Sequence, residues 1–282
     1  MSRRYEMGEK DPSIKDVFGL FSSAVDPDTG ELALAPLDVR RNTGNFIIAG
    51  KSLVPDFCIL QLISKGSDTT ASSISASFFY LARNPTAYAK VAQEVRAAFR
   101  SVSDIRAGPV LNNCVYLRAA INESLRMAPV ATQPLWREAD PGGCMVDGQQ
   151  IPEGLNVGAA IFSLHHRPEA FPDPYKWDLG RWIIDPTKDE EAEKERIKEI
   201  SRSFAPFSVG PRQCIAKNFA LMELMLTLAN VFYQLDFESA GTLGEGKEGA
   251  GWGREREGEF QLKSYFTSYM DGPMIRFKRR EL

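Results

Sequence analysis

The stretch FAPFSVGPRQCIAKN, residues 204–218, decides the fold of this chain. Its turn-forming residues lead to a single cysteine, Cys214, and an apolar run of helical length, residues 219–235, follows at once. We therefore predict Cys214 at the N-terminus of a buried helix, where unpaired N–H groups and the helix dipole favour a thiolate. Gly210 lets the backbone approach a flat ligand, and Arg212 supplies a fixed positive charge suited to a carboxylate.

The composition indicates an ordinary globular protein. Of the 282 residues, 43% are hydrophobic and 25% are charged, which is enough for a sizeable core. The net charge is −3, so no nucleic-acid partner is indicated. The four cysteines show no paired spacing, which suggests neither a disulfide framework nor a zinc site. His165 and His166 are adjacent, and we expect a loop or surface role for them rather than metal binding.

The residues around Cys214 resemble the haem-thiolate signature of the cytochrome P450 family. Phe207, Gly210, Arg212 and Cys214 stand at the family's spacing, and Ala216 occupies a position that is usually Gly. The resemblance implies that these five residues bind haem, with the Cys214 thiolate as the axial ligand of the iron. Taken alone, the motif also fits a structural cysteine at a helix cap.

Two further motifs resemble P450 structural elements. Glu123 and Arg126 lie three residues apart in a predicted helix and can pair on one face. In the family such a pair forms a buried triad with a later arginine, which corresponds to Arg181 here, although the usual Pro-Glu before it is absent. Arg137 falls, to within a residue, where the family places an arginine for a haem propionate.

Residues 65–70, KGSDTT, resemble the family motif that lies over the distal face of the haem. Asp68 and Thr69 correspond to the acid and the alcohol that relay protons to dioxygen. Lys65, however, stands where the family has alanine. If residues 51–66 are an insertion, the preceding Ala-Gly restores the motif without a mismatch.

Two origins for residues 51–66 stay open. The segment includes Pro55, which would break a helix interior at a cost of roughly 3 kcal/mol. A splice-donor sequence can encode Gly-Lys-Ser at residues 50–52, so the segment can be translated intron sequence. The alternative is a natural loop or helix extension. Sequencing the spliced transcript distinguishes the two.

We predict a mainly α-helical fold with small β-sheets, the C-terminal part of the P450 fold, as one truncated domain over residues 1–282. We expect the N-terminal helices of full-length relatives to be missing, because those relatives are nearly twice this long. We expect no anchor, because residues 1–10 are polar and charged. Helices are expected at residues 13–25, from 36, and at 69–82, 85–100, 111–127 and 185–199. Strands are expected at 145–149, 155–161 and within 261–277, and residues 244–259 are expected to form a mobile loop.

The resemblance implies a haem-thiolate monooxygenase of the fungal microsomal type, from secondary metabolism or xenobiotic hydroxylation. It implies haem as cofactor, and O2- and NADPH-dependent hydroxylation of an apolar small molecule. NADPH-cytochrome P450 reductase would be the electron donor, with Arg202 and Lys217 as candidate contacts. Full-length relatives lie in the endoplasmic reticulum membrane, whereas a cytoplasmic location is open for a chain without an anchor.

Two alternatives remain. The first is a non-catalytic fragment of a truncated or mis-spliced gene, with impaired haem binding. The second is a P450 relative that rearranges peroxides or dehydrates its substrate, against which the retained Asp68 and Thr69 argue.

Overall fold

The computed structural model describes residues 25, 29–32, 55–265 and 267–281. The chain divides into two units, residues 1–68 and 69–282. In the first unit Val25 and Leu32 form an antiparallel bridge. The helix expected from residue 36 lies outside the described residues, as does nearly all of the one expected at 13–25.

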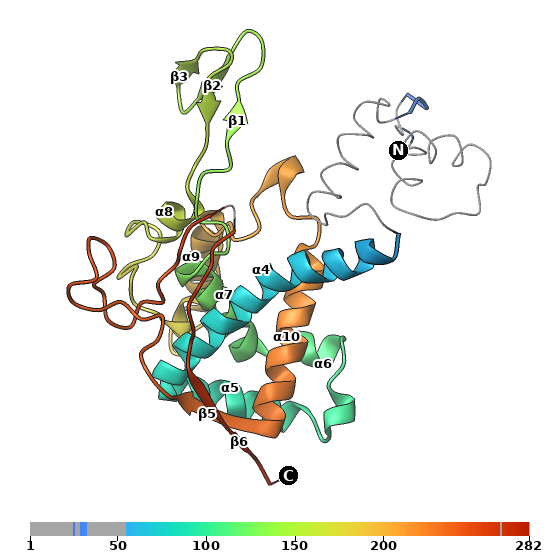
Figure 1. Cartoon of the computed structure of the whole chain (residues 1–282), viewed down its shortest axis with the longest axis vertical. Coiled ribbons are helices and arrows are strands. Elements are labelled where there is room, and N and C mark those ends of the chain that lie inside the picture. The colour runs from blue at the N-terminus through green and yellow to red at the C-terminus, as the bar shows by residue number, and fades with distance from the viewer. Residues whose placement is uncertain (1–24, 26–28, 33–54, 266, 282) are drawn as a thin grey trace. The chain divides into compact units, whose positions relative to one another are not determined.

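The described part of the chain is mainly helical (Figure 1). Its α-helices are α4 (Pro55–Arg83), α5 (Pro85–Ala98), α6 (Pro109–Asn112), α7 (Val115–Met127), α8 (Ile161–His165), α9 (Glu190–Arg202) and α10 (Lys217–Gln234). Three short 3₁₀ helices accompany them: η1 (Val102–Asp104), η2 (Leu179–Trp182) and η3 (Gly210–Arg212). This agrees with the expected fold class.

Local chemistry sets where the helices begin and end. Pro85 cannot continue α4 but suits the first position of α5. The helix expected at 111–127 is split, because the Glu94 carboxylate accepts the N–H groups of Tyr116 and Leu117 (3.0 and 2.9 Å) and so caps α7 from α5. The helix expected from 185 starts only at α9, since the Asp189 side chain accepts the Ala192 N–H and acts as its N-cap.

Among the described residues, three two-stranded antiparallel sheets accompany the helices. The strands are β1 (Arg137–Glu138) with β4 (Asn156–Val157), β2 (Cys144–Val146) with β3 (Gln149–Ile151), and β5 (Leu235–Ser239) with β6 (Ile275–Arg279). The β2–β3 hairpin turns at Asp147 and Gly148, both with positive φ, as the Asp-Gly pair predicts. The other strands are shorter than expected: only residues 156–157 of 155–161 and residues 275–277 of 261–277 are strand.

The core of the second unit lies where four helices meet, and Figure 1 shows α10 beside α5 and α7. Each helix contributes a fully buried side chain: Phe79 from α4, Val91 from α5, Leu117 from α7 and Leu228 from α10. The prediction of a buried final helix holds only for its second half. Phe219, in the first turn, is 63% exposed, and the buried positions of α10 begin at Leu224.

The glycine-rich segment 244–259, expected to be mobile, is tied to the helices. Glu245 forms an ion pair with Arg83 at the end of α4 (2.8 Å), and Glu259 is buried. The Gly246 N–H donates to the Glu259 carbonyl (3.0 Å), so the two ends of the segment are joined. Composition alone missed these long-range contacts.

Candidate functional site

Cys214 ends a loop that folds back on itself before α10. Its backbone N–H donates to the Phe207 carbonyl (2.8 Å), and its carbonyl accepts the Lys217 N–H at the start of the helix (3.3 Å). Ser208 and Gly210 have positive φ (61° and 74°), which allows the tight reversal between these contacts. The loop therefore fixes the cysteine backbone and leaves its side chain exposed.

The residues of this loop fit a haem group. Among the described cysteines none is in a disulfide, and Cys214 presents an exposed thiol, the donor that haem iron takes in P450s. A Cβ added at Gly210 would meet no protein atom within 4 Å, so a planar group can approach the backbone there. Phe207 is half-buried, and Arg212 and Ala216 are exposed, with Ala216 at the N-cap of α10.

Behind the loop, the structure brings the expected triad together. The Arg126 guanidinium pairs with both Glu123 carboxylate oxygens (2.9 Å each), and both side chains are fully buried. Arg181 Nε donates to the same carboxylate (3.3 Å). The Trp182 indole N–H (2.9 Å) and the Asp178 backbone N–H (3.0 Å) complete its donors. Motif spacing predicted the three charged residues but gave no signal for the last two donors.

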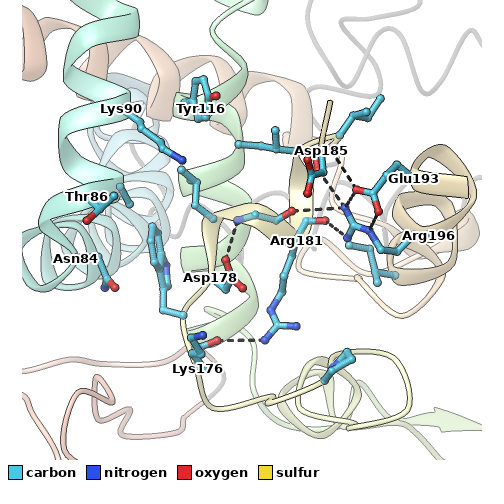
Figure 2. A pocket seen from close by; sticks show the side chains of 18 of the residues that line it. Asn84, Thr86, Lys90, Tyr116, Lys176, Asp178, Arg181, Asp185, Glu193 and Arg196 are labelled. Atoms are coloured by element: carbon cyan, nitrogen blue, oxygen red, sulfur yellow. Dashed lines mark hydrogen bonds and ion pairs between the residues drawn. The ribbon is translucent and has the colours of Figure 1, made fainter. Parts of the chain in front are cut away.

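Arg181 is also fixed from its other side (Figure 2). It lies in a hollow of about 1240 Å³ between α5, α7, η2 and α9. Its Nη2 donates to the carbonyl of Asp173 (3.0 Å), and its own carbonyl accepts from Arg196 of α9 (2.8 Å). Arg196 is in turn paired with Glu193 (2.8 Å). The charged helix α9 thus holds the segment that carries the third triad residue.

The two histidines are buried, which corrects the expected loop or surface role. His165 ends α8 and His166 follows it, and burial is the main cause that lowers the pKa of His165 to about 3 and that of His166 to about 4. The His165 ring contacts the backbones of Arg126 (3.2 Å) and Ala205 (2.9 Å). Adjacency in sequence gave no hint of this position, which depends on how α8 packs on α7.

The proposed distal residues lie on α4. Asp68 is exposed and Thr69 is half-buried, and the helix runs without interruption through residues 65–70. Pro55 is the first residue of α4, where proline is tolerated, so the expected interior break does not arise. Thr70, the next residue, is buried and donates to the Glu223 carboxylate of α10 (3.3 Å), a contact that the motif did not predict.

Arg137 lies on β1 and is exposed. Its guanidinium donates to the carbonyls of Leu135 (3.2 Å) and Trp136 (2.8 Å), the two residues just before β1. A role at a haem propionate therefore stays a prediction.

The family model for cytochrome P450 matches residues 57–245. The chain belongs to the cytochrome P450 family. The expected resemblance is thereby confirmed, and the matched residues include most of α4, the Glu123–Arg126 pair and the Cys214 loop of this P450 chain.

Fungal P450 monooxygenases are among its relatives. The P450 chain is 37% identical to the cytochrome P450 monooxygenase atnE of Emericella nidulans over 95% of its own length and 46% of that protein. It is 39% identical to apf8 of Gibberella fujikuroi, over 94% of its own length and 66% of the relative. The chain thus spans about half to two thirds of the length of these curated relatives.

Solved structures show the same fold. The haem domain of cytochrome P450DA superposes with a TM-score of 0.61 at 21% identity, over 98% of this chain and 52% of that domain. A cytochrome P450 designated CYP102L1 gives the same TM-score at 21% identity, over 99% of this chain and 54% of the other. The P450 chain therefore has part of the P450 fold.

Proposed function

We propose that this chain carries the thiolate side of a P450 monooxygenase that hydroxylates an apolar small molecule with O2 and electrons from NADPH. The observation that supports the proposal most directly is the exposed Cys214 thiol, in a loop closed by its own backbone and placed before α10. The names of the fungal relatives support the same reaction class.

In this proposal the loop residues hold the haem. Cys214 binds the iron through sulfur, and Gly210 allows the ring to lie close to the backbone. The exposed guanidinium of Arg212 would pair with a propionate carboxylate, with Arg137 as a second candidate. The haem, when bound, supplies the oxidation chemistry, and the residues of this chain orient it.

Asp68 and Thr69 are proposed to move protons. The Thr69 hydroxyl passes a proton toward the haem, and the exposed Asp68 carboxyl replaces it from solvent. The electron donor is proposed to be a reductase that contacts Arg202 and Lys217, both exposed near the Cys214 loop in sequence. Arg202 already pairs with Glu199, so Lys217 is the better candidate.

The endoplasmic reticulum location of full-length relatives and the cytoplasmic location left open for this chain both stay predictions. Over the residues that the structure describes, the helices are too short or too polar to cross a bilayer.

The alternative function, a non-catalytic fragment with impaired haem binding, stays a prediction. Its own residues would then keep the triad and the loop without supporting turnover.

The reduced carbon monoxide difference spectrum of the haem-reconstituted chain tests the proposal. We expect a red-shifted Soret band that marks thiolate ligation, and we expect Cys214→Ala to lose it. Cys144→Ala is the matched control, because Cys144 is also a free thiol but lies on the β2–β3 hairpin. A wild-type chain without that band would reject the proposed function in favour of the fragment.

A further inference from the structure

The His165 ring bridges α7 and the base of the Cys214 loop, which is residues 204–207. The Ala205 N–H can only donate, so His165 Nε2 accepts its hydrogen bond (2.9 Å). The ring proton is therefore on Nδ1, which donates to the Arg126 carbonyl (3.2 Å). A single neutral ring thus joins the end of the triad helix to the first residues of the loop.

The Arg126 side chain also binds the backbone of His165. Its Nη1 donates to the His165 carbonyl (2.8 Å), while its Nε and Nη2 bind the Glu123 carboxylate. Arg126 and the His165 residue are both fully buried. The exchange of hydrogen bonds in both directions leaves the imidazole little freedom to turn.

A second route leads from the same carboxylate to the same part of the loop. Trp182 donates to Glu123, and its ring contacts Phe204 at a centroid distance of 4.5 Å. Phe204 also stacks on the His165 ring (5.2 Å, 30°). The triad therefore reaches the loop base through one hydrogen bond and two ring contacts.

Backbone hydrogen bonds connect the base of the loop to Cys214. The Ala205 carbonyl accepts the Ser208 N–H (3.0 Å), which forms the next turn of the loop. The carbonyl of Phe207, inside that turn, accepts the Cys214 N–H (2.8 Å). A shift of Ala205 would thus be passed to the residue that holds the cysteine.

We propose that His165 is a positioning residue for the Cys214 thiol: it locks residues 204–207 to α7 and so sets where the sulfur stands. The proposal rests on the proposed function for its effect on haem ligation. The locking itself is a property of the chain and can be measured without haem.

His166 provides a matched control. It is buried like its neighbour, but its Nδ1 is bonded within α8, to the Phe162 carbonyl (2.8 Å). Its Nε2 has no hydrogen-bond partner among the described residues. A substitution at His166 therefore removes a buried imidazole without removing a link to the loop.

Three full-length variants separate the two hydrogen bonds of His165. His165→Gln keeps an acceptor near the position of Nε2, so the Ala205 amide should stay protected from hydrogen exchange. His165→Asn keeps only the group near Nδ1, and the Ala205 amide should exchange roughly fivefold faster or more. His166→Asn should leave that amide unchanged. An Ala205 amide that is equally protected in His165→Asn and wild type would overturn the proposal.

Haem reconstitution supplies the second readout. We expect His165→Asn to move the reduced carbon monoxide band from the thiolate type toward the non-thiolate type, while His165→Gln and His166→Asn keep it. A thiolate band unchanged in His165→Asn would overturn the positioning role. If His165→Asn does not fold, His165→Gln decides, because loss of Ala205 protection in it contradicts the proposal. If the wild-type chain shows no thiolate band, the proposed function is rejected. Hydrogen exchange at the Ala205 amide then still tests whether His165 fixes residues 204–207 to α7.

Discussion

At the scale of single residues, the Glu123 carboxylate organises the region behind the cysteine. It accepts five donors, four of them from side chains and one from the backbone of Asp178. A buried charge in such a network is compensated only while all its partners remain. Removal of the charge leaves the Arg126 guanidinium buried without a counter-ion.

We expect Glu123→Gln to lower the free energy of unfolding by about 3–5 kcal/mol, because it strands Arg126 and Arg181. Urea denaturation followed by circular dichroism measures the change. Glu191→Gln is the control: Glu191 is paired with Lys194 on α9 at 2.7 Å, but its side chain is 81% exposed. That control should change stability by less than about 1 kcal/mol. Equal losses in both variants would contradict the role given to burial.

At the scale of elements, the segment between β5 and β6 shows how a loop with a flexible composition is fixed. Gly244 has φ +82°, and a Cβ there would lie 2.1 Å from the Asp271 carbonyl oxygen and 2.4 Å from the Phe260 ring. Gly249 has a similar φ of +76°, but its Cβ would meet nothing within 4 Å. A comparison of alanine substitutions at the two glycines therefore distinguishes the cost of backbone strain from the cost of a steric clash.

Gly249→Ala should cost roughly 1–2 kcal/mol, the penalty for a side chain in the left-handed region. Gly244→Ala should cost clearly more, because the backbone of residue 271 must also move. Thermal unfolding of both variants measures the difference. Similar melting temperatures would show that residues 244–259 are not held against Phe260 and Asp271.

The elements also show which parts of this fold the sequence could predict. Residue spacing was sufficient for the Glu123–Arg126 pair and the Cys214 loop, because each depends on residues close together in the sequence. The start of α7 was not predictable, since its cap is the Glu94 carboxylate, 21 residues earlier than Val115. His165 was missed for the same reason: its partners lie 39 and 40 residues away.

At the scale of the whole molecule, the two buried histidines link stability to pH. Burial and the nearby Arg126 charge lower the pKa of His165 to about 3 and of His166 to about 4, from an ordinary value of 6.5. The unfolded chain therefore binds more protons than the folded chain below pH 6.5. By linkage, the stability that is fully present above this pH is lost as the pH falls toward about 4.

We expect the free energy of unfolding to fall by up to about 1.4 kcal/mol per pH unit for each histidine in this range. Urea denaturation of the wild type and of His166→Gln at a series of pH values isolates the contribution of His166 to this pH dependence. The variant should show the shallower slope below pH 6.5. Parallel curves would mean that His166 is protonated in the folded chain.

The three cysteines whose surroundings are described differ in how accessible their thiols are to oxidation. Burial, followed by the Glu94 charge, raises the pKa of Cys114 to about 11, so its thiolate is scarce and shielded. Cys214 is open to solvent, and oxidation to the sulfinic or sulfonic acid would be irreversible there. The residue best placed to hold iron is thus more open to oxidation than the buried Cys114. A chain stored without a reductant would lose the Cys214 thiolate as a ligand. Its fold would stay the same, and its mass would rise by only a few oxygen atoms.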